Sequence, residues 1–302
     1  MSDATMSEIV DTAGDDLVEA PLVSHEERRK LEWISIVGPV VVFAAFVGLW
    51  YFMHHWGLRH LFDKPGHLMP PVHDILYDSF VRRVPQPDGS DYIARSDLIR
   101  ALEWTAIVAF VGLAASIVLG IVLAVVMNRA AWLERTAWPY LIAMQAIPIL
   151  AIVPILGSIF GYEPSTRILV CVMIALFPIV SNTLFGLQSV DRSQHDLFTL
   201  KGVSRMTRLF KLEFPAAMPA IFAGFRISAG LSVIGAVVGE LFFRQGGRGI
   251  GIVMDKFRSR AQWTLTYGAL LLTCLLGIAV FLLFSWISKR AIGKWHDSAH
   301  SS

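Results

Sequence analysis

The chain has 302 residues, of which 55% are hydrophobic and only 17% are charged, and its mean hydropathy is +0.57. These values exclude an ordinary soluble domain, because a water-exposed surface needs a larger share of polar side chains. The formal net charge of +2 decides little, since the charges of a membrane protein matter by side and not by sum. The composition therefore predicts an all-α membrane protein.

The first 27 residues carry eight acidic side chains and no lysine or arginine. Such a segment cannot bury enough apolar surface to fold alone, so we expect residues 1–30 to form a disordered acidic tail. Nothing in this tail resembles a signal peptide, and Arg28, Arg29 and Lys30 directly precede the first apolar stretch. We expect that stretch to act as an uncleaved insertion signal.

Six stretches are apolar over the roughly 20 residues that a helix needs to cross a bilayer. They predict six transmembrane helices: an N-terminal span with an extracytoplasmic loop (31–95), a five-helix core (96–295) and a short tail (296–302). The stretches are 34–52, 104–127, 140–160, 168–187, 221–243 and 266–287.

Five histidines follow the first span, and a metal site has to be considered there. No pair of them has the i, i+4 spacing beside a glutamate that is typical of a hydrolytic zinc helix. We therefore expect solvated loop histidines and no bound metal. The histidines are His54, His55, His60, His67 and His73.

Two spans carry small residues at every fourth position, a spacing that lets helices approach closely. Such patterns are common in membrane helices in general, but two full stripes favour tight packing of these two spans. The stripes are Gly112, Ser116, Gly120 and Ala124 in the second span and Gly224, Ser228, Ser232 and Ala236 in the fifth.

Prolines 148, 154 and 178 are expected to break the third and fourth spans, because each removes a backbone donor. The freed carbonyls must bond to neighbours or to water in a cavity, so broken helices indicate a translocation pathway. Gln145 and Asn182 are the polar side chains nearest these breaks. Each could line the pathway or form an interhelical hydrogen bond, and both roles stay open.

Glu240 extends the small-residue stripe of the fifth span, four residues beyond Ala236. A carboxylate at that depth is costly unless it is paired or near water. We expect Glu240 at a gate or at the exit of the pathway, the alternative being a side chain that reaches out to the interface.

The polar loop at 191–219 separates the fourth and fifth spans and predicts two short helices around a glycine. Ser193 and Asp196 form a capping-box pattern, so a helix is expected to begin there and to end at Leu200, with Gly202 as the left-handed residue. A second, basic and apolar helix is expected from Ser204. Its cations are Arg205, Arg208 and Lys211, and Pro215 and Pro219 are expected to end it.

The segment 244–251 is rich in glycine but lacks the features of a nucleotide site. A phosphate-binding loop needs Gly-Lys-Ser/Thr, and a dinucleotide loop needs a βαβ unit around it. We expect these glycines to allow a tight reversal of the chain before a short helix near 252–257.

Six spans place both termini on one side of the membrane. With the termini inside, 13 lysines and arginines lie on the cytoplasmic side, Arg129 among them, and 12 lie on the other side, including Arg167 and several in the long 54–103 segment. Long loops contribute less to orientation than the cluster before the first span, so we expect cytoplasmic termini.

The loop and its flanking spans resemble the permease subunits of binding-protein-dependent ABC importers of bacterial inner membranes. In that family the loop between the fourth and fifth helices carries a Glu-Ala-Ala motif, a glycine and a proline-rich ending. Gly202 occupies the glycine position, and Ser204 and Arg205 follow as usual. The ending is Phe214-Pro215-Ala216-Ala217-Met218-Pro219, while Asp196-Leu197-Phe198 replaces the Glu-Ala-Ala triplet.

The similarity runs from about Asp97 to about Trp295 and is greatest to nitrate, sulfonate, taurine and vitamin-precursor importers. The likeness to these particular importers lies in the segments 147–148, 181–184 and 247–251 and in the segment 68–71, which precedes that range.

This resemblance implies the type I importer permease fold and a transport subunit with no enzymatic activity and no cofactor. It implies a dimer of ABC ATPase subunits, a second permease (a copy of this chain), an extracytoplasmic substrate-binding protein and the lipid bilayer as partners, and no nucleic acid. The residues assigned to ATPase coupling are Asp196, Gly202, Ser204, Arg205, Arg208 and Pro215.

Two other classes of membrane protein fit these residues less well than the importer permease does. An ATP-independent secondary carrier needs ionisable residues inside the membrane to couple to ions, and the spans hold almost none. A membrane-embedded metalloenzyme would have to use the histidine cluster, which lacks suitable ligand spacing.

Overall fold

The computed structural model describes residues 25–85, 91–243 and 248–293, and it divides into two compact units that meet between Pro71 and Val72. The expected boundary at 95/96 thus lies inside the second unit. Among the described residues, five helical segments are long and apolar enough to span a membrane, and a bent pair of helices supplies a sixth. The prediction of an all-helical protein with six spans is confirmed, apart from two three-residue strands.

The first unit consists of α2 (His25–Phe52), a π turn (Met53–Gly57), α3 (Leu58–Leu61) and a 3₁₀ turn (Gly66–Leu68). Helix α2 begins inside the segment expected to be a tail, whose residues 1–24 lie outside the described part. The segment after α3 folds back on the helix through hydrogen bonds from Trp50 Nε1 to the Pro70 carbonyl (2.8 Å) and between His54 Nδ1 and the Met69 carbonyl (2.9 Å).

The predicted loop histidines lie on helical turns instead. His54 and His55 belong to the π turn, His60 to α3 and His67 to the 3₁₀ turn, while His73 lies in α4 of the second unit. The loop prediction was wrong because the first helix continues, through its π turn, for nine residues beyond Phe52.

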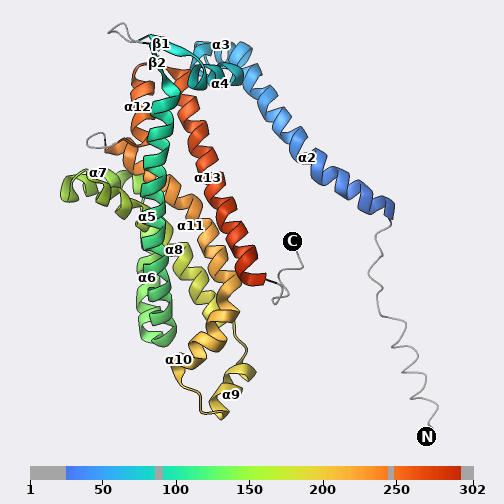
Figure 1. The fold of residues 1–302 in the computed structure, drawn as a ribbon, viewed down its shortest axis with the longest axis vertical. Helices are drawn as coiled ribbons and strands as arrows, with labels where there is room; N and C mark the ends of the chain where they lie inside the picture. Colours follow the sequence, from blue (N-terminus) through green and yellow to red (C-terminus); the bar gives the residue numbers. More distant parts are fainter. Residues whose placement is uncertain (1–24, 86–90, 244–247, 294–302) are drawn as a thin grey trace. The chain divides into compact units, whose positions relative to one another are not determined.

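The second unit contains the remaining elements (Figure 1). A short antiparallel hairpin of β1 and β2 pairs Arg83 with Ile93 and connects α4 to α5. The elements are α4 (Val72–Phe80), β1 (Arg83–Pro85), β2 (Asp91–Ile93), α5 (Ala94–Arg129), α6 (Ala131–Ala146), α7 (Ile149–Phe160), α8 (Pro164–Gln188), α9 (Arg192–Leu200), α10 (Arg205–Arg208), the π turn η3 (Leu209–Glu213), α11 (Phe214–Phe242), α12 (Ile250–Ser259) and α13 (Trp263–Ile292).

Helix α8 is the centre of this unit, because both α5 and α11 pack along it. The small-residue stripes of α5 and α11 are buried. Cβ atoms built at Gly224 and Gly235 of α11 would lie 2.9 Å from the Pro178 carbonyl oxygen and from Cys171 Cα, respectively, and both of these atoms belong to the backbone of α8. The prediction that the stripes serve close packing is therefore confirmed.

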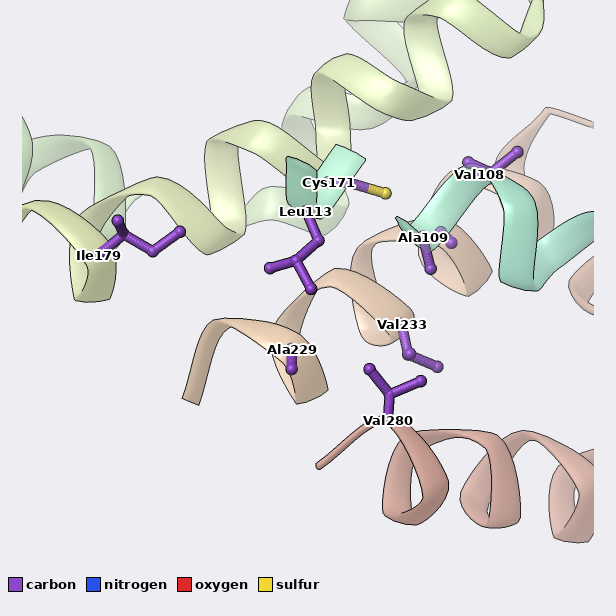
Figure 2. Packing of buried hydrophobic residues seen from close by; sticks show 9 residues of the cluster. Val108, Ala109, Leu113, Cys171, Ile179, Ala229, Val233 and Val280 are labelled. Atoms are coloured by element: carbon purple, nitrogen blue, oxygen red, sulfur yellow. The ribbon is translucent and has the colours of Figure 1, made fainter. Parts of the chain in front are cut away.

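Buried apolar side chains of α5, α8, α11 and α13 form the main core. Figure 2 shows residues from four helices around one interior, with Cys171 and Ile179 contributed by α8. The other members are Val108, Ala109 and Leu113 of α5, Ala229, Val233 and Ala236 of α11, and Val280 of α13. Ser228 adds a polar link, since its hydroxyl donates to the Ala175 carbonyl of α8 at 2.7 Å.

The predicted break is present at Pro148 and absent at Pro154 and Pro178, since Pro154 lies inside α7 and Pro178 inside α8. The third span does break at Ile147 and Pro148, where α6 and α7 meet at 98°. Helix α8, in contrast, continues through Pro178. The Pro178 carbonyl accepts hydrogen bonds from the side chains of Asn182 (2.8 Å) and Ser181 (3.3 Å) within the same helix. Packing of α8 between α5 and α11 supports the helix across the missing donor.

We predict that Gly235→Ala destabilises the bundle, because its Cβ would press on the backbone of α8. Overpacking of this kind costs about 1–3 kcal/mol in free energy of unfolding. Gly230→Ala, on the same helix with nothing within 4 Å of its Cβ, is the matched control and should be neutral or slightly stabilising. Unfolding of the detergent-solubilised protein would show the difference, and equal stability of the two variants would contradict this account of the interface.

Candidate functional site

The loop between α8 and α11 forms two helices at the end of the bundle opposite α12 and α4 (Figure 1). Helix α9 begins at Arg192 with Asp191 as its N-cap, and Asp191 makes no side-chain capping bond. Ser193, the expected capping residue, instead lies inside the helix, and the N-cap is two residues earlier. The reason is that the Asp191 carbonyl already accepts from the amides of Gln194 and His195.

Gly202 ends α9 in the left-handed conformation with φ +64°, as predicted. The amide of Gly202 donates to the Thr199 carbonyl at 3.0 Å, and the amide of Val203 donates to the Phe198 carbonyl at 3.2 Å. These bonds satisfy carbonyls that the end of α9 leaves without partners within the helix. The chain therefore reverses at a defined angle.

Ser204 caps the second helix, since its hydroxyl accepts from the Thr207 amide at 3.2 Å. Arg208 then ties the two helices together by donating from Nη2 to the Thr199 hydroxyl at 2.9 Å. The start of the helix at Ser204 is confirmed.

Pro215 and Pro219 do not end this helix, which corrects the prediction. The helix continues from Arg205 to Phe242 through the π turn η3. Pro215 lies at the first positions of α11, directly after that turn. A π turn shifts the hydrogen-bond register by one residue, which allows the helix to pass a residue that has no N–H.

A buried carboxylate joins this continuous helix to the end of α5. Glu213 is almost fully buried and accepts from Asn128 Nδ2 at 3.1 Å and from Arg129 Nη2 at 3.4 Å. Arg129 also donates to the carbonyl of Arg205 at 2.9 Å. We call Asn128, Arg129 and Glu213 the clasp.

Apolar side chains of the loop are exposed. Leu200 is 86% exposed, Phe210 62% and Met206 61%. Asp196 and Arg205 are exposed beside them. A loop between two spans lies in water or at the headgroups, so this patch of apolar and charged side chains is suited to covering by another protein.

Of the predicted pathway residues, Gln145 is exposed at the end of α6, next to the bend before α7. Asn182 is half-buried and bonds within its own helix, as described above. The hydrogen bond between helices in this region comes from Ser228, whereas the bond described for Asn182 stays within α8. The lining role of Gln145 and Asn182 stays a prediction.

Glu240 is fully buried near the end of α11. The hydroxyl of Thr105 in α5 lies 2.9 Å from both carboxylate oxygens and donates to them, and the amide of Gly251 donates to Oε2 at 3.0 Å. Arg167, also fully buried, interacts electrostatically with this carboxylate. We call Thr105, Arg167 and Glu240 the outer cluster. It lies at the start of α8 and the end of α11, which are the ends of these helices away from α9.

A cavity of about 520 Å³ lies beside the end of α11. Its lining includes none of Gln145, Asn182 and Glu240. The lining residues are Leu241, Phe242, Met254, Asp255 and Arg258.

Sequence reasoning missed the clasp and the partners of Glu240. Arg129 and Arg167 were counted only as loop cations, and Asn128 and Thr105 lie in an apolar helix where nothing distinguishes them. Glu213 had one signal, since it is an acidic residue in an otherwise basic segment.

Comparison with known proteins places this arrangement in a family. Residues 116–293 match the family described as the inner membrane component of binding-protein-dependent transport systems. The chain belongs to this family, which makes it an inner-membrane permease of a binding-protein-dependent ABC importer.

Permeases of several named importers are similar to this chain. The chain is 34% identical to the formylaminopyrimidine transport permease protein ThiX of Halalkalibacterium halodurans over 197 residues, 63% of this chain and 78% of that protein. It is 33% identical to the nitrate import permease protein NrtB of Synechocystis over 245 residues, 80% of this chain and 85% of that protein. A crystal structure of an amino acid ABC transporter with histidines has the same fold, with a TM-score of 0.50 and 15% identity over 66% of this chain and 94% of that one.

We predict that Glu213→Ala destabilises the protein by about 1–3 kcal/mol, because the half-buried Asn128 and the more exposed Arg129 lose their shared acceptor. Lys211→Ala, an exposed change two residues away, should alter stability by less than about 0.5 kcal/mol. Thermal unfolding of both variants in the same detergent tests this, and equal melting temperatures would show that the clasp contributes nothing.

Proposed function

We propose that the loop at 191–219 is the docking site for a separate ABC ATPase subunit, and that this chain pairs with a second copy of itself. A substrate-binding protein delivers the solute on the other side of the membrane. ATP-driven closure of the ATPase dimer pulls on the loop and moves the permease between inward-open and outward-open states. A conformational change requires interactions that differ between two states, and a rigid helix pair in a cleft supplies them.

The single observation that carries this proposal is the rigid pair of helices around Gly202 with its exposed apolar side chains. Leu200, Met206 and Phe210 present apolar surface that no described part of the chain covers. Arg208 and the left-handed glycine hold the two helices at one angle, so a force applied to α9 is transmitted to α10. From α10 the helix continues without interruption into α11.

The triplet Asp196-Leu197-Phe198, which replaces the Glu-Ala-Ala of the family motif, affects which ATPase can dock. Asp196 retains the acidic group of the family motif, while Leu197 and Phe198 are larger than the usual alanines. Leu197 is half exposed and Phe198 half-buried. We propose that the cleft of the cognate ATPase is widened to accept them.

Both termini are proposed to be cytoplasmic. Arg167 was counted among the cations of the other side, but it is buried in α8 and does not act as a loop charge. Without Arg167 in the count of loop cations, the excess of lysines and arginines on the side of the 191–219 loop is larger.

For the solute, we propose a small molecule of the range that the relatives carry, which their names give as formylaminopyrimidine, riboflavin, nitrate and aliphatic sulfonates. The neutral polar side chains of Gln145 and Asn182 favour an organic molecule such as a vitamin precursor over a metal ion. Ligand screening of the soluble binding protein, followed by ATP-dependent uptake in proteoliposomes, tests this.

Co-purification tests the importer mechanism itself. The chain should bring an ATPase with it, and uptake should stop when ATP is omitted. An ATP-independent secondary carrier, the alternative, would accumulate solute alone and respond to an ion gradient. That result would overturn the proposal.

We predict that Gly202→Val uncouples ATP hydrolysis from uptake. A β-branched residue at φ +64° costs about 1–2 kcal/mol of backbone strain and changes the angle between α9 and α10. The coupling ratio, ATP hydrolysed per solute imported, is the measurement.

Gly161→Val is the matched control, because Gly161 also has a positive φ, of +82°, and open space around it, but lies outside the loop. It should carry at least as much backbone strain, because its ψ of 174° lies in a region nearly restricted to glycine, and it should keep the coupling ratio. Normal coupling in Gly202→Val would count against docking at this loop.

A further inference from the structure

Helix α12 is capped by side chains from two other helices. It begins at Ile250, and its N-cap is Gly249, which has no side chain to offer. The amide of Ile250 donates to Thr105 Oγ1 of α5 at 2.8 Å, and the amide of Gly251 donates to Glu240 Oε2 of α11 at 3.0 Å. The first amides of a helix have no partners within it, so α5 and α11 supply what α12 lacks.

The fit around this cap leaves no room for side chains on the glycines. A Cβ at Gly249 would overlap the Glu240 carboxylate. A Cβ at Gly251 would lie 2.8 Å from Glu240 Cβ and 2.7 Å from the Val237 carbonyl oxygen. Gly249 has φ −74° and ψ 162°, a conformation open to any residue, so only the approach of the carboxylate requires glycine there.

Burying the Glu240 carboxylate costs free energy because it loses its water, and the contacts around it offset that cost. Glu240, Thr105 and Arg167 are all fully buried. A negative charge at a helix N-terminus is favourable, and hydrogen bonds from a hydroxyl and an amide offset its loss of water. Removing α12 from this position would leave the carboxylate without one of its donors.

We propose that Glu240 is the positioning residue that fixes α12 to the moving core at the outer end of the permease. The inference rests on the proposed function. Helix α11 runs unbroken from the loop to Glu240, with the clasp near its beginning and α12 bound near its end. A displacement that begins at the ATPase loop therefore reaches α12 through one continuous helix, so that α12 moves with the core. Glu240 acts through α12 and not by touching the solute.

A double-mutant cycle in the assembled complex tests the contact. Gly249→Ala and Glu240→Ala should each speed hydrogen exchange of the amides at 250–254 by roughly 5- to 100-fold, the range expected for losing a buried hydrogen bond. The double variant should exchange no faster than Glu240→Ala alone, because removal of the carboxylate makes room for the new Cβ.

Two further variants control for a general loss of stability or of assembly. Gly230→Ala in α11 should leave exchange at 250–254 unchanged, since its Cβ meets nothing within 4 Å. Glu240→Gln keeps the size and one acceptor oxygen, so it should stay closer to wild type than Glu240→Ala and allows the test if the alanine variant does not assemble. Independent, additive effects of the two alanine changes would overturn the proposal.

The response to nucleotide separates this inference from the proposed function. With Mg²⁺-ATP and vanadate, exchange should change at α9 and at α12 in the wild-type complex. In Glu240→Ala or Glu240→Gln the α9 response should remain, and the α12 response should fall, more in alanine than in glutamine. A wild-type complex without an α9 response would overturn ATPase docking, while an α12 response unaffected by Glu240→Ala would overturn the role of Glu240 alone.

Discussion

The contact of α8 with α5 and α11 is the interaction on which the rest of this structure depends. Lipid chains are as apolar as the helix surfaces, so burial alone does not drive these helices together. Close van der Waals packing and interhelical hydrogen bonds must do so. Gly224 and Gly235 let the backbones of α11 and α8 approach closely, and Ser228 adds a hydrogen bond across the same interface. The orientation of the loop and of the outer cluster follows from that contact, because both belong to helices that it fixes.

Two buried carboxylates on one continuous helix, Glu213 and Glu240, hold that helix rigidly against α5. Glu213 joins the start of α11 to the end of α5, and Glu240 lies against Thr105 in the other half of α5. The two positions are 27 residues apart, or about 40 Å along a helix. Antiparallel helices tied at two such distant points resist tilting against each other. The assembly is therefore suited to moving as one body when its loop is pulled.

The two ends differ in what they present to other molecules. At the loop, apolar side chains of α9, α10 and η3 are exposed, while the Glu213 carboxylate of the clasp is buried. At the other end, the polar groups of the outer cluster are hidden as well, but they bind an element of the same chain. The loop end thus leaves apolar surface exposed, whereas the other end is completed from within by α12.

The sequence by itself determined the membrane class, the number of spans, the close packing of the two stripes and the reversal at Gly202. Each follows from a local rule: length of apolar runs, spacing of small residues, or the conformational freedom of one glycine. Its resemblance to importer permeases also indicated the family.

The tertiary structure alone decided the continuity of α8 through Pro178, the passage of α10 into α11, and the partners of Glu213 and Glu240. Neighbouring helices support a helix across a proline, so the local breaking tendency of Pro178 and Pro215 did not prevail. Thr105 and Glu240 are 135 residues apart in the chain, and only the packing of α5 against α11 brings the hydroxyl to the carboxylate. No local pattern encodes that pairing, because it depends on the angle and register of two helices.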